Sequence, residues 1–327
     1  VYVLYSQLSE ETKQTLNKMS TSNVRVELKN VSWIAENPNL YTCAYFSVEM
    51  YYRLWIPEIF KEYDKVLYLD CDILVRADVA ELFNYDLGDN YIGACRDLLP
   101  KSLSSYITDE LSCLPENYFN AGLTMFNVSA WLENGLYEKC MEKLNQFRNL
   151  QYLDQDILNM VCNGKVYYFD FYWNVMWSAL MQTSENIYLS EKGKEAFLNC
   201  QKSADRIKLI HYTSGRKPWN EGRYCRYADL WQECAEKSPF FAGKPRIRYK
   251  LFWGCFLPVQ TVKNISLWGC FPYSFNKFSP CLKISYGAHS CRMKLFGHLC
   301  LYKIKCSEQK IVHLLFGFLP ILCLKRM

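Results

Sequence analysis

The stretch KVLYLDCDILV, residues Lys65 to Val75, carries the strongest signal for how this chain folds and what it binds. Its apolar first half is typical of a buried strand, and Asp70 and Asp72 follow where that strand ends. In α/β sheets, ligands bind at the carboxyl ends of strands. Two neighbouring carboxylates repel each other unless a cation neutralises them, so the pair predicts a divalent metal site. A turn in which both side chains cap backbone amides is the alternative for D-x-D taken alone.

On both sides of this stretch, short β-branched apolar runs alternate with longer segments of helical periodicity. The alternation predicts an α/β fold built from βα units, with a mixed, mainly parallel sheet flanked by helices. Ser9 and Ser129 are the expected N-caps of the first and third helices. The expected strands are 1–5, 66–69, 91–94, 123–126, 167–169 and 207–211. The expected helices are 10–19, 42–55, 129–147, 154–162 and 224–237.

A change of composition near residue 240 predicts two regions, 1–240 and 241–327. The 327 residues are half apolar, which excludes a disordered chain. Residues 244–327 contain fourteen Lys and Arg and a single acid, Glu308, whereas the preceding 243 residues carry 24 bases and 32 acids. A basic region beside an acidic body indicates a polyanionic partner, either anionic lipid or nucleic acid.

The basic region alternates Lys and Arg with Trp, Phe and Leu, and it repeats a degenerate LFG-type unit at Gly254, Gly269, Gly297 and Gly317. This texture suits the interface of an anionic membrane, and small extended or hairpin units are expected. A basic β subdomain packed on the core is the alternative. Nucleic-acid binding is a third, weaker choice, and nucleic acid is not the expected partner, because the aromatic residues match no RNA-binding motif.

Two features limit the cellular setting. The sixteen cysteines are scattered through a chain that can fold without disulfides, so most are expected to be reduced, buried thiols. The longest apolar segment, 314–324, is too short to span a bilayer. A cytoplasmic protein, peripheral on the inner face of the plasma membrane, is therefore expected.

A second strand ends in a polar residue at LIHYTSGRKPW, which begins at residue 209. His211 offers an imidazole to the same ion as Asp70 and Asp72, and mixed oxygen and nitrogen ligands favour Mn²⁺ over Mg²⁺. Gly215 and Lys217 are candidates for binding a diphosphate. Taken singly, an ordinary strand-end histidine and a solvated loop lysine are the alternatives.

Three further stretches contain candidate binding residues. FNAGLTMFN places Asn120 beside Ala121 and Gly122, where small residues leave room for a ligand. LDQDILN puts three polar side chains at a helix N-terminus, where they could simply complement the helix dipole. Arg53 lies among apolar neighbours in VEMYYRLW, so it needs an anionic partner, either structural or bound.

Taken together and in order, YLDCDILV, FNAGLTMFN, LDQDILN and HYTSGRKPW resemble glycosyltransferase family 8, especially the bacterial lipopolysaccharide galactosyl- and glucosyltransferases. The resemblance covers residues 1–235. It implies a GT-A fold, UDP-galactose or UDP-glucose as donor, and a glycan or glycolipid acceptor. It also implies Mn²⁺, with Mg²⁺ as the alternative, and retention of the anomeric configuration.

Position by position, the resemblance implies that Asp70, Asp72 and His211 are metal ligands and that Lys217 binds the diphosphate. The residues that it places at the donor sugar are Arg53, Asp97, Asn120, Asp154 and Gln155. The chain departs from the family pattern in two places. The first βα unit is expected to be absent, with Val1 opening the second strand, and the glycine usual after the His-Tyr pair is displaced by Ser214 to Gly215.

Retention allows two mechanisms. Gln155 is a poor nucleophile, which favours front-face attack, with an oxygen of the departing UDP taking the acceptor proton. Asp154 is the alternative nucleophile. Two rival functions stay open: a metal-dependent nucleotidyltransferase or phosphohydrolase, and a non-catalytic membrane- or glycan-binding protein.

Overall fold

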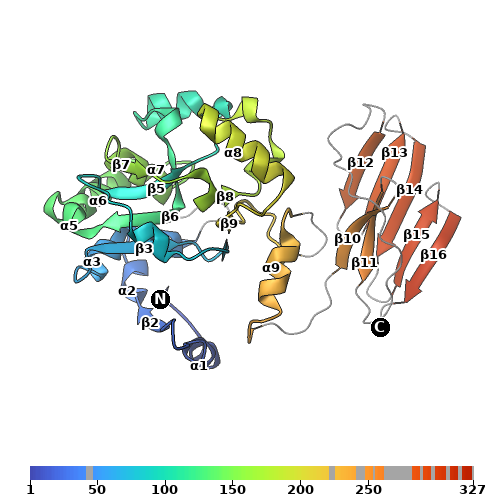
Figure 1. Cartoon of the computed structure of the whole chain (residues 1–327), viewed down its shortest axis with the longest axis horizontal. Coiled ribbons are helices and arrows are strands. Elements are labelled where there is room, and N and C mark those ends of the chain that lie inside the picture. Colours follow the sequence, from blue (N-terminus) through green and yellow to red (C-terminus); the bar gives the residue numbers. More distant parts are fainter. Residues whose placement is uncertain are drawn as a thin grey trace. The chain divides into compact units, whose positions relative to one another are not determined.

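The structure, a computed structural model, describes residues 1–41, 47–220 and 225–240 with their side chains, and the backbone of seven strands between residues 247 and 325. The chain divides into two compact units. The first consists of Val1–Lys217 and Cys225–Phe240, and the second of Pro218–Tyr224 and Phe241–Met327 (Figure 1).

A four-stranded sheet in the order β3-β6-β5-β7 forms the centre of the first unit. Strand β6 lies between β3 and β5 and runs antiparallel to both, whereas β5 and β7 are parallel. The strands are β3 (Lys65–Leu69), β6 (Phe119–Asn127), β5 (Ile92–Arg96) and β7 (Val166–Tyr168).

Two smaller sheets complete the first unit. In the first of them β9 pairs antiparallel with β4 and parallel with β8, and in the second β1 and β2 are parallel. These strands are β4 (Ile73–Val75), β9 (Leu209–His211), β8 (Val175–Met176), β1 (Tyr2–Tyr5) and β2 (Glu27–Asn30). The predicted α/β class with a mixed sheet between helices is confirmed (Figure 1). The expectation that parallel pairs dominate is wrong, because the described strands of this unit make three parallel and three antiparallel pairings.

Two of the predicted helices form close to the expected bounds. Helix α1 (Glu10–Asn17) is capped as predicted, since Ser9 Oγ accepts a hydrogen bond from the Thr12 backbone N–H at 3.2 Å. Helix α7 (Asp154–Val161) begins at the predicted residue. The helix expected at 224–237 is shorter, α9 (Ala228–Ala235).

The long helix predicted for 129–147 is wrong. The chain instead forms α5 (Val128–Glu133) and α6 (Leu136–Gln146), and Gly135 between them has a φ of +57°, which a right-handed helix cannot contain. The predicted cap Ser129 is also wrong. Asn127 is the N-cap, because its side chain accepts a hydrogen bond from the Ala130 N–H.

The helix expected at 42–55 is replaced by the 3₁₀ helix η1 (Val48–Trp55), and residues 42–46 lie outside the described part of the chain. Helix α8 (Glu191–Lys202), capped by Ser190, was not predicted. Short elements connect the rest: α2 (Ser32–Ala35), α3 (Ile56–Ile59), α4 (Ala80–Phe83), η2 (Lys101–Leu103), η3 (Tyr106–Glu110), η4 (Pro115–Asn117), η5 (Phe171–Trp173), η6 (Ala179–Met181) and η7 (Ser184–Asn186).

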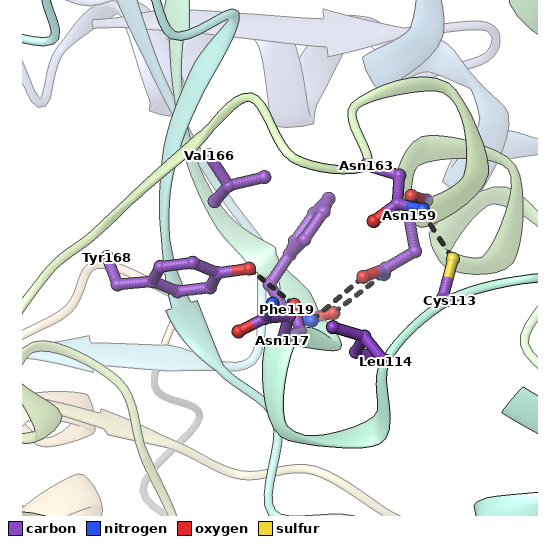
Figure 2. Close-up of a pocket in the computed structure, with 8 residues that line it drawn as sticks. All are labelled: Cys113, Leu114, Asn117, Phe119, Asn159, Asn163, Val166 and Tyr168. Atoms are coloured by element: carbon purple, nitrogen blue, oxygen red, sulfur yellow. Dashed lines mark hydrogen bonds between the residues drawn. The ribbon is translucent and has the colours of Figure 1, made fainter. Parts of the chain in front are cut away.

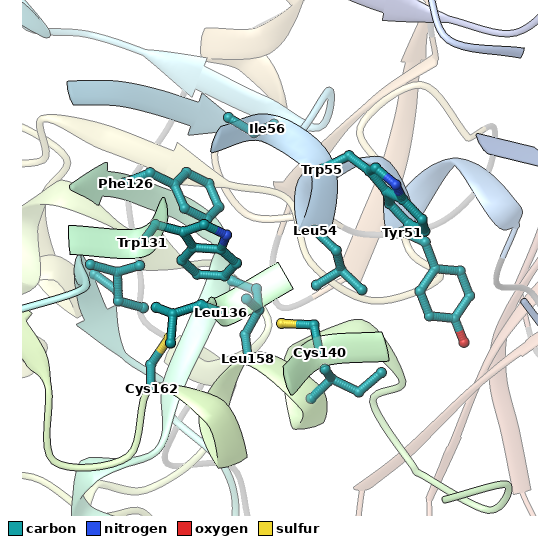
Figure 3. Packing of buried hydrophobic residues seen from close by; sticks show 14 of the residues in the cluster. Tyr51, Leu54, Trp55, Ile56, Phe126, Trp131, Leu136, Cys140, Leu158 and Cys162 are labelled. Atoms are coloured by element: carbon teal, nitrogen blue, oxygen red, sulfur yellow. The ribbon is translucent and has the colours of Figure 1, made fainter. Parts of the chain in front are cut away.

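The largest hydrophobic core holds η1 against the helices that follow β6. Figure 3 shows Leu54 and Trp55 of η1 in the same cluster as Trp131 of α5, Cys140 of α6 and Leu158 of α7. All five side chains are at most 3% exposed. This packing places η1 beside the N-terminal half of α7, which brings polar residues from both elements into one site.

Cysteines serve as core residues in the first unit. Of the eight cysteines in its described part none is paired, and six are buried, while Cys71 and Cys234 are exposed. The predicted burial of most cysteines is confirmed for this part of the chain.

The second unit is described as antiparallel strands. β10 (Ile247–Phe252) pairs with β11 (Cys255–Gln260). Five more strands form a sheet in chain order: β12 (Leu282–Gly287), β13 (Ser290–Leu295), β14 (Leu299–Cys306), β15 (Lys310–Leu315) and β16 (Leu319–Lys325). The hairpins agree with the extended units predicted here, but the four glycines of the LFG-type units lie outside the described residues. No helix within the described residues has the length and apolar character needed to cross a membrane.

Candidate functional site

Three predicted metal ligands meet at one place, and we call Asp70, Asp72 and His211 the ligand triad. One ligand atom from each lies within 4.8 Å of the others. His211 Nε2 is 3.5 Å from Asp70 Oδ2 and 3.1 Å from Asp72 Oδ1. The two aspartates follow β3, and the chain then enters β4, whose Ile73 lies opposite His211 in β9. The pairing of β4 with β9 therefore brings His211 next to the two aspartates.

Gly122 in β6 leaves the space that the triad occupies. Its carbonyl accepts a hydrogen bond from the Asp70 N–H at 2.8 Å. A Cβ atom at this position would lie 2.2 Å from His211 Cε1 and 2.7 Å from Asp70 Oδ2. The sequence predicted that a small residue leaves room for a ligand here. The structure shows that the room is taken by the side chains of the triad.

The two oxygens of Asp70 have separate partners. Oδ1 accepts hydrogen bonds from Arg53 Nη2 at 2.8 Å and from the Tyr68 hydroxyl at 2.6 Å, which leaves Oδ2 to face His211. Burial acts to raise the pKa of Asp70, but the Arg53 guanidinium and His211 outweigh it and hold that pKa well below its usual range. Asp70 is therefore ionised, the state in which a carboxylate can bind a metal ion.

His211 carries the opposite charge when no ion is bound. Burial acts to lower the pKa of this imidazole, but Asp70 and Asp72 outweigh burial and raise the pKa to about 9. A protonated His211 thus offsets part of the negative charge of Asp70 and Asp72.

Loading the triad is expected to release about one proton per ion at pH 7, because a metal binds only the neutral imidazole and His211 is almost fully protonated there. Release should decline as the pH rises through about 9. Titration calorimetry with Mn²⁺ in two buffers of different ionisation enthalpy measures the number of protons. A heat that is identical in the two buffers at pH 7 would contradict the protonated state.

Lys217 contacts the triad from the loop after β9. Its Nζ pairs with Asp72 Oδ2 and donates to the Tyr212 carbonyl at 2.8 Å. In the same loop Ser214 has a φ of +73°, the left-handed conformation that favours glycine. A Cβ at Gly215 would meet nothing within 4 Å. The displaced glycine is therefore not the residue that takes the strained backbone position.

Beside the triad lies a second group, which we call the polar cluster: Asp97, Asn120 and Gln155. Asn120 Nδ2 donates to Asp97 Oδ2 at 3.2 Å and to Gln155 Oε1 at 3.1 Å. Gln155 Nε2 donates to Asp97 Oδ2 at 2.9 Å, and the Ala121 N–H donates to Gln155 Oε1 at 3.0 Å. All three side chains are at most 9% exposed. Burial raises the pKa of Asp97, against the hydrogen bonds from Asn120 and Gln155.

A clamp between β6 and α7 holds the polar cluster in register. Asn159 of α7 accepts from the Phe119 N–H and donates to the Phe119 carbonyl, both at 2.9 Å (Figure 2). Phe119 precedes Asn120, and Asn159 lies one turn after Gln155 on the same helix. The two-sided hydrogen bond therefore fixes how far Gln155 stands from Asn120.

Arg53 joins the triad to Asp154, which confirms that this buried arginine has anionic partners. Arg53 Nε lies 2.8 Å from Asp154 Oδ2, yet its N–H donates to the Met50 carbonyl at 3.1 Å. Asp154 Oδ2 is thus paired by charge without receiving a hydrogen bond from the described residues. Burial outweighs the Arg53 charge and raises the pKa of Asp154 to about 7.

Sequence reasoning missed two residues of the site. Tyr68 of β3 lies two positions before Asp70, and residues two apart in an extended chain lie on the same face, so this spacing could have indicated the contact. Asn174 lies 3.1 Å from His211 Nδ1 through its Oδ1. No local pattern marks Asn174, because it follows the short helix η5 and reaches the site only through the fold.

Comparisons with known proteins agree with this geometry. The sequence profile of Glycosyl transferase family 8 matches residues 1–222. A putative glycosyltransferase of Haemophilus influenzae is 26% identical over 76% of this chain and 78% of its own length. The lipopolysaccharide 1,2-glucosyltransferase of Escherichia coli is 25% identical over 62% of this chain, which spans 58% of that enzyme's length.

Among solved structures, the galactosyltransferase LgtC in complex with donor and acceptor sugar analogues superposes with a TM-score of 0.62. It is 26% identical, and the match covers 73% of this chain and 84% of LgtC. The GT-A fold expected from the sequence motifs is therefore confirmed.

Proposed function

The chain belongs to glycosyl transferase family 8, and from that premise we propose that it is a retaining, Mn²⁺-dependent hexosyltransferase that moves galactose or glucose from a UDP-sugar to a glycan such as lipopolysaccharide. Residues 1–240 would form its catalytic domain. The convergence of Asp70, Asp72 and His211 beside a buried polar cluster is the observation that carries this proposal. The named relatives support both hexoses, since one is a glucosyltransferase and another a galactosyltransferase.

The donor set of the triad fits a divalent ion. Neighbouring ligands of an octahedral ion with bonds of about 2.1 Å lie about 3 Å apart, and His211 Nε2 lies 3.1 Å and 3.5 Å from the two carboxylate oxygens. One imidazole with two carboxylates favours Mn²⁺, with Mg²⁺ as the alternative. When bound, such an ion stabilises the negative charge of a departing diphosphate.

Lys217 is the cation that would bind the diphosphate of the donor. Without donor it pairs with Asp72, whose other oxygen faces His211. With Asp72 engaged as a metal ligand, the Lys217 ammonium would lose its carboxylate partner and would be available to bind the phosphates of the donor. Gly215, where a side chain would have open space, lies two residues before Lys217 on the same loop.

The polar cluster would hold the hexose. Gln155 Oε1 already accepts hydrogen bonds from Asn120 Nδ2 and from the Ala121 N–H, so its oxygen is oriented and weakly nucleophilic. We therefore favour front-face attack, in which the acceptor hydroxyl passes its proton to an oxygen of the departing UDP. Asp154 is the alternative nucleophile, and its pKa of about 7 leaves a substantial ionised fraction at neutral pH.

Replacing Asp154 with alanine is expected to leave measurable transfer, within about 10²–10³-fold of the wild type, because the residue acts through its charge beside Arg53. Mass spectrometry of the wild type with donor alone should find no glycosyl-enzyme. Asp154→Asn is the matched control, since it keeps the volume and removes the charge. A trapped glycosyl-Asp154 adduct would establish the double-displacement route instead.

Incubation with Mn²⁺ and a panel of UDP-sugars tests the function as a whole. We expect UDP release from UDP-galactose or UDP-glucose, its loss with a chelator and its recovery when Mn²⁺ is returned. Release of sugar phosphate or inorganic phosphate would point to the nucleotidyltransferase or phosphohydrolase alternative. No turnover of any donor by folded protein would leave the non-catalytic alternative.

We also propose that the enzyme is cytoplasmic and binds the anionic inner face of the plasma membrane through residues 241–327. The support is their fourteen Lys and Arg against one acid. The chain should float with vesicles that contain anionic phospholipid, less at high salt, and should not float with neutral vesicles. Flotation that is unchanged after deletion of residues 245–327 would contradict this proposal and favour a packed β subdomain.

A further inference from the structure

Asn174 lies between the ligand triad and the polar cluster and uses both ends of its side chain there. The residue is 1% exposed and directly follows η5. Its Oδ1 is 3.1 Å from His211 Nδ1, and its Nδ2 donates to Asn120 Oδ1 at 2.9 Å. A buried amide with a partner at each end has an orientation that its surroundings can determine.

The orientation of Asn120 follows from backbone groups, whose hydrogen-bonding roles are invariant. The Ala121 N–H can only donate, so the Gln155 atom that it contacts at 3.0 Å is the carbonyl oxygen. The Asn120 atom that faces this oxygen must then be the amide nitrogen. The Gly122 N–H independently requires an oxygen at the other end of Asn120, at 3.1 Å. Both constraints give the same orientation.

The orientation of Asn174 follows in turn. Its group that faces Asn120 Oδ1 must be the NH₂, so its oxygen faces His211. An oxygen at that position accepts a hydrogen bond and requires a hydrogen on His211 Nδ1. When the imidazole is neutral, its single hydrogen therefore stays on Nδ1. The lone pair is left on Nε2, the atom that faces Asp70 and Asp72.

We propose that Asn174 is a positioning residue that holds His211 in the Nδ1–H tautomer with Nε2 toward the metal, and that it ties this ligand to Asn120 of the polar cluster. The inference rests on the metal site proposed above. Partners of this kind, which orient a ligating histidine through its second nitrogen, contribute about 10- to 100-fold to metal affinity. Backbone N–H groups of β6 set the orientation of Asn120, and through it the orientation of Asn174. The position of β6 relative to α7 therefore determines the tautomer of His211.

Two substitutions separate the two ends of Asn174. Asn174→Leu removes both contacts at similar volume, and we expect Mn²⁺ affinity to fall by about 10- to 100-fold. Asn174→Asp keeps an acceptor for His211 Nδ1 but sets a carboxylate oxygen against Asn120 Oδ1. This variant should bind Mn²⁺ within a few-fold of the wild type and should bind UDP-sugar more weakly. Electron paramagnetic resonance of free Mn²⁺ measures the first affinity, and donor titration at saturating Mn²⁺ measures the second.

Gln232→Leu is the matched control, because it also removes a buried amide, 5% exposed, which donates a hydrogen bond to Glu236 and belongs to neither the ligand triad nor the polar cluster. It should retain Mn²⁺ affinity. Circular dichroism confirms that each variant is folded before its affinity is compared.

The outcomes separate this inference from the proposed function. If Asn174→Leu binds Mn²⁺ as well as the wild type, the positioning role is wrong and the proposed function stands. If Asn174→Asp is as weak as Asn174→Leu, the acceptor role toward His211 is overturned. If the folded wild type binds no Mn²⁺, the proposed metal site itself fails, and this inference fails with it.

Discussion

Replacing Gly122 with alanine is expected to abolish measurable Mn²⁺ binding. The added methyl carbon would stand 2.2 Å from His211 Cε1 and 2.7 Å from Asp70 Oδ2, far inside van der Waals contact. Neither ligand side chain is free to move: His211 is buried, and Asp70 is held by hydrogen bonds from Arg53 and Tyr68. They cannot move aside without leaving the triad. Calorimetric titration with Mn²⁺ measures the loss.

Two further variants show whether a loss of Mn²⁺ binding comes from the clash with the ligand side chains. Gly215→Ala makes the same chemical change where a Cβ meets nothing within 4 Å, so Mn²⁺ affinity should be retained. Asp72→Asn adds no volume and removes one ligand charge, so it should weaken Mn²⁺ binding while the fold persists. Normal Mn²⁺ affinity in Gly122→Ala would show that the ion is held by other atoms.

Replacing Arg53 with methionine is expected to lower the free energy of unfolding by about 3–5 kcal/mol, the usual cost of leaving a buried charge without its partner. The Arg53 side chain is 8% exposed and lies 2.8 Å from both Asp70 and Asp154, whose side chains are 23% and 6% exposed. Its guanidinium also stacks 4.5 Å from the Tyr68 ring centre. Methionine preserves much of the packing volume, so the loss reports the charge. Urea denaturation with a chelator present measures it.

The double variant Arg53→Met with Asp70→Asn tests whether the loss comes from an unpaired charge. Asp70 is the ionised carboxylate that loses its partner, so its replacement should restore part of the stability. Lys194→Met, which removes an exposed lysine paired with Glu191, should change stability little. A cost for Arg53→Met no larger than that of Lys194→Met would mean that the two carboxylates are solvated or protonated without the arginine.

The sequence alone was sufficient where a signal is local. An apolar run that ends in Asp70 and Asp72, and another that ends in His211, indicate ligands at strand ends, because ligands of α/β proteins bind at the carboxyl ends of strands. An arginine among apolar residues must have an anionic partner, and Arg53 has two. The cap at Ser9 follows from the same kind of short-range rule.

Local signals failed where two conformations satisfy them equally. Gly135 is tolerated within a helix, and nothing in 129–147 shows that the chain turns there with a positive φ. The apolar pattern of 48–55 fits a 3₁₀ helix as well as an α-helix. Strand composition also does not state direction, so the antiparallel course of β6 between β3 and β5 was missed.

By itself the sequence thus determined which residue types stand at the ends of which strands, and with them the family and the candidate metal ligands. Only the tertiary structure decided which of these groups touch. It paired Lys217 with Asp72 and placed Arg53 between two carboxylates. It also brought Asn174 Oδ1 to His211 Nδ1. The physical reason is that a hydrogen bond needs its atoms placed to within a few tenths of an ångström. Strand register and helix packing set such positions, and they join segments that are distant along the chain.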